Sequence, residues 1–234
     1  MFRKLLVIAA AMTAAACATP YVGTPYDRAG AGVQQIAVTD DSVPERLTAY
    51  EAASVGSNFG LIGALVDVGI QSNREAAMTR VLGDIGFDAE ASLEQRIVAA
   101  VSAQGYEVAL IEGPDRAKRE FHLAYPDAAP GTDAYLDVVV TYYGYLAAGA
   151  FQPWRPTAEA TVRLVSAREG GKVLMENMIV YNSMYPQEGV ITLTPNPDFS
   201  FANQGEMEAD PAKLAAGIED ALNQIAVTAA QLLR

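Results

Sequence analysis

The chain has 234 residues, of which 51% are hydrophobic and 8% aromatic, enough to build one large domain with its own core. Its 28 acidic residues against 16 basic ones give a formal net charge of −12. So acidic a surface repels the phosphates of nucleic acids, and we therefore do not expect nucleic acid as a partner. It also repels anionic lipid headgroups, so a basic surface patch cannot be what attaches the protein to a membrane.

Residues 1–16 are typical of a secretory signal. Arg3 and Lys4 make a positive start, residues 5–12 form an apolar run, and residues 14–16 are small alanines before a cleavage point. A spanning helix needs about 20 apolar residues, and this run is too short. We therefore expect the segment to be removed and to play no part in the fold.

The cysteine that follows indicates lipid attachment. The run Ala14-Ala15-Ala16-Cys17 resembles the lipobox of bacterial lipoproteins, which implies that Cys17 becomes the first residue and carries diacylglycerol and an amide-linked acyl chain. Ala18 in the next position implies sorting to the outer membrane. The alternative is plain cleavage after Ala16, but that would leave the chain's single cysteine as an unpaired thiol in an oxidising compartment. We expect a lipid-anchored protein that faces the periplasm.

The next elements alternate between strand and helix. Glycines and prolines predict that residues 17–32, after the lipidated cysteine, form a flexible tether, and that one domain occupies residues 33–234. A strand is expected over 33–39 and a helix over 58–83, with a break near Ser72-Asn73 as an alternative. A second helix over 92–104 ends before Gly105, and a strand over 106–111 follows.

Three further strands carry the clearest pattern. Residues 157–168 alternate apolar and polar side chains, and Gly170-Gly171 predicts a tight turn onto residues 172–183. Residues 134–146 precede them with high strand propensity. The last helix begins at Pro211, after Asp210 as its cap, and keeps an apolar stripe to the end of the chain.

This order predicts an α+β fold, with a mostly antiparallel sheet of about 4–5 strands and helices packed on one face. The order is similar to that of periplasmic accessory lipoproteins of envelope machines, such as the curli-secretion lipoprotein, the lipoprotein activators of peptidoglycan synthases and the auxiliary lipoproteins of lipid-transporting ABC systems. The resemblance implies a protein that assembles with partners and catalyses nothing.

The sequence carries no catalytic or metal-binding motif. It lacks a nucleophile elbow, a phosphate-binding glycine loop, paired cysteines and a zinc-binding helix. His122 is the only histidine and lies in a charged stretch, so it is expected to be a surface residue. We expect no enzyme activity, no cofactor and no metal.

Three features are candidates for binding. If the three strands form a meander, linkers 147–156 and 184–209 meet at one edge of the sheet. Their aromatic side chains form either a partner-contact surface or local packing over the sheet end; they are Phe151, Trp154, Tyr185, Phe199 and Phe201. Residues 59–70 form either a buried helix or a contact with the bilayer or a sister subunit. Tyr135, Tyr143 and Tyr145 share a strand face, as a ligand platform or as ordinary sheet packing.

Together these observations predict a membrane-anchored periplasmic lipoprotein that acts as a non-catalytic binding or assembly component of a cell-envelope complex. Its partners are the membrane, through the lipid on Cys17, and an envelope protein. The alternative function is a carrier or chaperone of a lipid or glycolipid, with an apolar pocket between helices and sheet.

Overall fold

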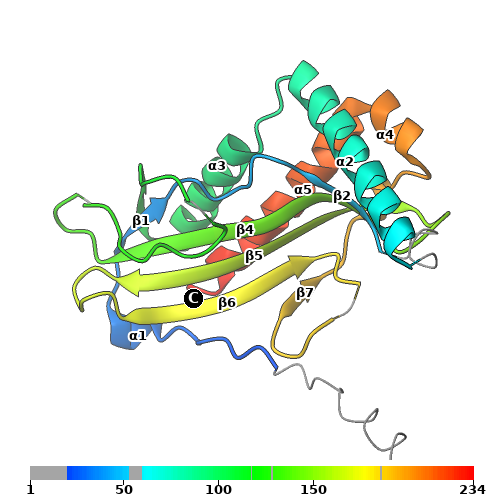
Figure 1. Cartoon of the computed structure of the whole chain (residues 1–234). Coiled ribbons are helices and arrows are strands. Elements are labelled where there is room, and N and C mark those ends of the chain that lie inside the picture. The colour runs from blue at the N-terminus through cyan, green and yellow to red at the C-terminus, as the bar shows by residue number, and fades with distance from the viewer. Residues whose placement is uncertain (1–19, 53–59, 117, 128, 185) are drawn as a thin grey trace, which may run out of the picture.

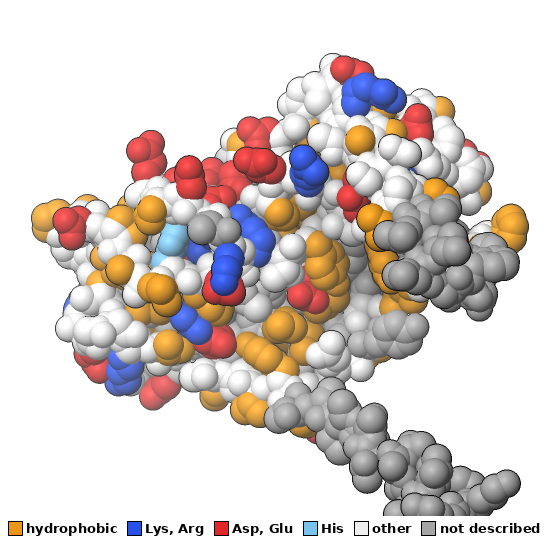
Figure 2. All heavy atoms as spheres, in the orientation of Figure 1, with side chains coloured by type: hydrophobic (Ala, Val, Ile, Leu, Met, Phe, Trp, Pro, Cys, Tyr) orange, Lys and Arg blue, Asp and Glu red, His pale blue; other side chains and the backbone are white. Residues whose placement is uncertain are grey.

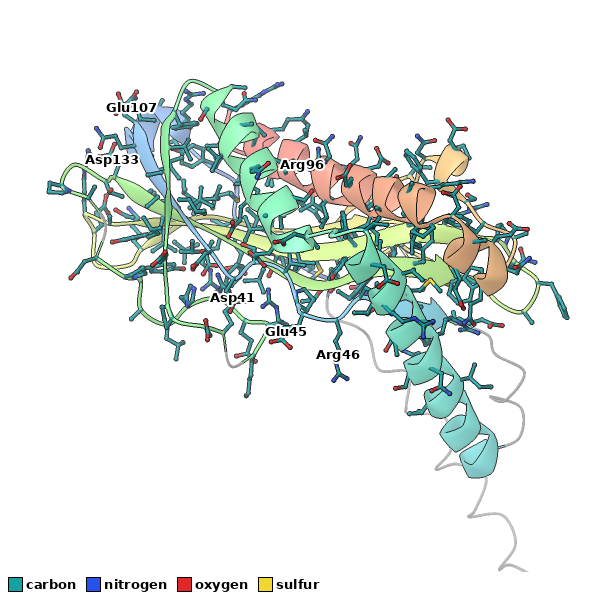
Figure 3. The ribbon with its side chains drawn as sticks, turned by 90° about the horizontal axis from the view of Figure 1, so that it is seen from above. Asp41, Glu45, Arg46, Arg96, Glu107 and Asp133 are labelled. Carbon is teal, nitrogen blue, oxygen red and sulfur yellow. The ribbon has the colours of Figure 1, made fainter. Side chains whose placement is uncertain are left out.

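The computed structural model describes residues 20–52, 60–116, 118–127, 129–184 and 186–234, and it describes the side chains of α2 from residue 68 onwards. A seven-stranded mixed sheet forms one layer, and the helices α3 and α5 cover one of its faces (Figure 1). The opposite face carries no helix layer over its centre (Figure 3), and we call it the open face. The prediction of an α+β fold is confirmed.

The centre of the sheet is the predicted meander. It consists of β4 (Ala134–Ala147), β5 (Trp154–Ser166) and β6 (Val173–Tyr181), which pair antiparallel in that order. Gly170 and Gly171 have φ angles of +58° and +84° in the turn between β5 and β6. Only glycine adopts such angles freely, which is why the adjacent glycines marked this turn in the sequence.

The outer strands pair parallel, so the prediction of a mostly antiparallel sheet with 4–5 strands is wrong. β1 (Gln35–Thr39) pairs parallel with β3 (Glu107–Ile111) and with β4, and β2 (Thr48–Glu51) pairs parallel with the far end of β4. β7 (Ile191–Leu193) pairs parallel with β6. The helices between β1 and β3 return the chain to its starting end, which makes the two strands parallel. β2 and β7 have four and three residues, too few for a periodic pattern.

The helix layer follows from capping and apolar spacing. α5 (Pro211–Gln231) begins where the Asp210 carboxylate accepts the Lys213 amide at 3.0 Å, and α3 (Ala89–Ser102) begins in the same way at Asp88. α5 has ten buried residues and packs between α3 and the sheet. α2 (Gly60–Asp84) is one unbroken helix, which rejects the break near Ser72-Asn73. Three short helices complete the structure. α1 (Arg28–Ala31) precedes β1, and η2 (Pro197–Phe199) and α4 (Gln204–Ala209) lie between β7 and α5.

α2 packs on the domain through its second half. Met78 and Leu82 are buried, whereas Val68 and Ile70 are 65% and 48% exposed. The ribbon of the first half extends away from the sheet on the side of the open face (Figure 3). Of residues 59–70, the described side chains at 68–70 are thus exposed, and those before 68 lie outside the described residues.

The expected tether is largely docked. Thr24 exchanges two backbone hydrogen bonds with Glu176 of β6, of 2.7 and 3.1 Å. Arg28 of α1 lies over the Tyr106 ring and donates to the Gln104 carbonyl at 3.0 Å. Residues 24–31 therefore form part of the folded domain, because backbone pairing and side-chain contacts fix a segment whose glycines and prolines had indicated flexibility.

Candidate binding groove on the open face of the sheet

The open face of the sheet has two different halves. The described part of residues 112–133, between β3 and β4, crosses one half and packs on it (Figure 1). Phe121 lies 3.9 Å from the Arg163 guanidinium of β5, and Tyr125 stacks on Tyr135 of β4 with ring centroids 4.8 Å apart. The other half is a hollow lined by side chains of β2, β4, β5 and β6.

A buried carboxylate holds the covering segment in place. Asp137 of β4 is 0% exposed and accepts hydrogen bonds from the Arg116 guanidinium at 2.7 Å, the Tyr125 hydroxyl at 3.1 Å and the His122 amide at 3.0 Å. The Thr39 hydroxyl of β1 adds a fourth at 3.3 Å. All the acceptor capacity of this carboxylate is used within the protein. The cluster is a clamp for residues 112–133 and offers no free group to a substrate.

His122 belongs to this clamp and is not the surface residue that the sequence predicted. It is half-buried, and its Nε2 atom has no hydrogen-bond partner among the described residues. Burial, and then the nearby Arg116 guanidinium, lower the pKa of the imidazole. A neutral imidazole next to a saturated carboxylate has no nucleophile to activate.

The uncovered half of the open face is a groove with a volume of about 420 Å³. Hydrophobic side chains gather around it over the centre of the sheet (Figure 2). The strand register places Tyr142, Glu159 and Val180 side by side across β4, β5 and β6, and Met178 lies one step along β6. The walls come from β2 and from the residues after β6; the further lining residues include Tyr50, Leu146, Asn182, Met184, Gln187 and Val190.

One side of the groove floor is polar. Glu159 accepts the Thr141 hydroxyl at 2.8 Å, and Thr157 donates to the Tyr181 carbonyl at 3.0 Å. Burial and the Glu159 carboxylate raise the pKa of Tyr142 to about 12, so its hydroxyl stays protonated and able to donate. The Nδ2 atom of Asn182 is buried in the wall without a partner among the described residues. An unpaired buried donor costs free energy.

The β6–β7 side of the groove is apolar. Met175 and Ile179 of β6 face the helices, and Met178 and Val180 point to the open face. A strand with one face toward water would carry polar side chains at these last two positions. Val190 precedes β7 and lies against the same end. A second hollow of about 220 Å³ adjoins the groove and shares Leu146, Asn182 and Met184 with it. The whole site is suited to a ligand with an apolar body and a few polar groups.

The five aromatic residues of the two linkers occupy different environments. As predicted, the linkers meet, because Trp154 and Phe201 exchange backbone hydrogen bonds of 2.8 and 2.9 Å. Both side chains lie in the core, 5% and 3% exposed, and Phe199 is half-buried. Phe151 is 100% exposed, with a φ of +65°, and Tyr185 lies outside the described residues. The structure thus leaves Phe151 alone on the surface among the four described residues of this set.

Tyr135, Tyr143 and Tyr145 do not form one platform. A β-bulge between Val140 and Tyr142 shifts the register of β4 by one residue. Tyr143 and Tyr145 therefore point into the helix-side core, where they are 7% and 1% exposed, whereas Tyr135 lies under residues 112–133. The bulge turns Tyr142 toward the groove in their place.

Within the residues that the structure describes, no helix is long and apolar enough to cross a bilayer. The same residues bring no three His, Cys, Asp or Glu side chains together in a metal-binding group. Comparisons of this chain with protein-family models, with curated proteins and with solved structures found no match.

Proposed function

We propose that this chain is a lipid-anchored protein of the outer membrane, facing the periplasm, and that it is a non-catalytic binding component of a cell-envelope complex. The observation that carries the proposal is the groove on the open face. Its volume of about 420 Å³ lies in the range of about 300–1,000 Å³ that ligand sites occupy. The recognition element is thus the groove, and the lipid on Cys17 supplies the attachment.

The chemistry of the groove supports binding more than catalysis. Glu159 is the one carboxylate among its lining residues, so the groove does not hold the pair of carboxylates across a cleft that general acid/base work with carboxylates needs. The polar side chains of Tyr142, Thr157 and Asn182 lie beside the apolar Met178 and Val180, a lining that suits an extended peptide with polar backbone groups and apolar side chains. We therefore propose an amphipathic segment of an envelope protein as the ligand.

A photo-crosslinking amino acid at position 50 tests this assignment in living cells. Tyr50 is 40% exposed at the groove rim, and Leu110 on β3, at the far edge of the sheet, is 44% exposed and serves as the matched control. We expect one discrete protein adduct from position 50 that is absent from position 110. Equal adducts from both positions, or none from position 50, would contradict the proposal.

Lipid attachment has its own test. Cells grown with an alkyne-tagged fatty acid should label the wild-type chain and leave Cys17→Ala unlabelled and free of the membrane or unprocessed. Equal labelling of both chains would show that Cys17 is not the lipidated residue.

The groove volume also favours the second candidate, a carrier of a lipid or glycolipid. The site lies on the face opposite the helices and not between helices and sheet, where we had expected such a pocket. A lipid adduct at position 50, in place of a protein adduct, would select the carrier.

A further inference from the structure

The N-terminal residues lie directly beside the groove. The Tyr21 carbonyl packs so tightly against Gly189 that a Cβ atom on Gly189 would overlap it. Gly189 stands between Gln187 and Val190, which both line the groove. Three residues after Tyr21, Thr24 is fixed to β6 by its backbone pairing with Glu176. The chain therefore enters the domain at the β6–β7 end of the groove.

This position limits how far Cys17 can lie from the groove. Cys17 lies four residue steps before Tyr21, and a fully extended chain advances at most about 3.6 Å per residue. The Cα atom of Cys17 is thus within about 14 Å of Tyr21, which touches the loop that forms the groove rim. Any acyl chain on Cys17 starts within reach of the groove.

The groove end that faces Tyr21 is also its apolar end. Ile179 and Ile191 are paired in the β6–β7 register, so Val190 lies next to Met178 at the strand edge. Met178, Val180, Met184 and Val190 line this end, and Glu159 lies one strand further in, with its carboxylate held by Thr141. An acyl chain can enter along the apolar side chains without leaving a charge unpaired.

We propose that the groove receives an acyl chain carried by the chain's own Cys17. The inference rests on the lipidation that is part of the proposed function. One acyl chain alone gives reversible membrane binding, whereas several give a stable anchor. Withdrawal of one chain into the groove therefore weakens attachment, and a ligand that fills the groove returns the chain to the bilayer and strengthens it.

Intramolecular photo-crosslinking of the lipid tests the proposal. The lipidated full-length protein is purified in detergent from cells grown with a fatty acid that carries a diazirine and an alkyne. After irradiation and digestion, we expect mass spectrometry to find the Cys17 lipid joined to the peptides that contain Met178 or Val190. An equal mixture of isotopically light and heavy protein should give light–light and heavy–heavy products, because donor and acceptor belong to one molecule.

Two variants test whether the crosslink depends on the groove. Met178→Trp fills the apolar end and should lower the intramolecular product about fivefold, while Val227→Trp, at a residue of α5 that is 36% exposed, should leave it unchanged. Thermal unfolding of both variants verifies that they are folded, and the wild-type crosslink map stands as evidence even if Met178→Trp fails to fold.

The possible results separate this inference from the function on which it rests. A chain without label at Cys17 overturns both. A labelled chain whose crosslinks reach only detergent or lipid overturns the inference alone. Mixed light–heavy products overturn it too, and show that a second copy of the chain, and not the same one, receives the acyl chain.

Discussion

The guanidinium of Arg116 and the carboxylate of Asp137 form an ion pair 2.7 Å long between side chains that are 1% and 0% exposed. The pair joins the segment over the sheet to the central strand, far from the sheet's edges. Charges this deeply buried are stable only while both partners are present, because each alone has lost its hydration.

Arg116→Met should therefore lower the free energy of unfolding by about 3–5 kcal/mol, as removal of one partner of a buried pair does. The double variant Arg116→Met, Asp137→Leu should recover only part of this loss, because the His122 amide and the Tyr125 hydroxyl lose their acceptor. Lys172→Met breaks a surface pair whose partners are 59% and 60% exposed and should cost no more than about 1 kcal/mol. Urea unfolding measures all three. A loss for Arg116→Met as small as that of the control would show that the clamp contributes little.

Trp154→Ala should cost about 3–5 kcal/mol of stability, because the ring is buried beneath the Arg74 guanidinium, 4.5 Å from its centroid. Phe151→Ala, in the same linker at a fully exposed position, should change stability by less than about 0.5 kcal/mol. Denaturant unfolding of the two variants decides whether Trp154 acts as a core residue. An unchanged unfolding midpoint for Trp154→Ala would show that Trp154 is not a core residue and would make it a candidate partner contact again.

Gly189→Ala should release the N-terminal segment from the groove rim. Gly189 has a φ of +83° and meets the Tyr21 carbonyl, while Gly171 has a φ of +84° and open space around it. The two alanine variants share the same backbone strain and differ in the steric overlap. Hydrogen exchange of the Thr24 amide, which donates to Glu176, should accelerate at least tenfold in Gly189→Ala alone. The same acceleration in Gly171→Ala would indicate general destabilisation instead.

Glu94 should give the protein a stability that falls as the pH rises. Burial, and then the neighbouring Glu90 carboxylate, raise the pKa of Glu94 to about 7 from its ordinary value of 4.5. Between these pH values the folded state holds a proton that the unfolded state releases, so this group's contribution is present below pH 4.5 and is lost as the pH rises to 7.

Glu94→Gln should accordingly be more stable than the wild type at pH 8, and this advantage should shrink toward pH 4.5. Urea unfolding at several pH values measures the difference, and Glu188→Gln, at an exposed position, is the control. A Glu94→Gln profile parallel to that of the wild type would contradict the assignment.

The sequence predicted the elements whose pattern is long and local. The meander, its glycine turn and the last helix could be identified because alternation, positive φ angles and an apolar stripe each extend over many residues. β2 and β7 could not, since strands of four and three residues carry no period. The parallel pairing of β1 and β3 depends on the helices that connect them. The pattern of side chains within a strand does not indicate the direction of its neighbour, so this pairing could not be predicted from the strands alone.

The groove was missed for a different reason. The open face of β5 is polar, at Thr157, Glu159 and Thr161, and in an antiparallel sheet such alternation predicts that the polar face meets water. The available signal lay in the neighbouring strand: β6 has Met178 and Val180 on its open face and Met175 and Ile179 on its helix face, so both faces carry apolar side chains. A strand with two apolar faces indicates that something covers each of them.

The strand order also determines when the sheet can form. β1 pairs with β3 and β4, and β2 pairs with β4, so among the described strands none before residue 107 has a neighbour until the later part of the chain has been synthesised. Pairings between residues far apart in sequence close large loops and form slowly. The described strands in the first third of the chain thus leave the ribosome without strand partners, a kinetic property that would suit the export that we propose.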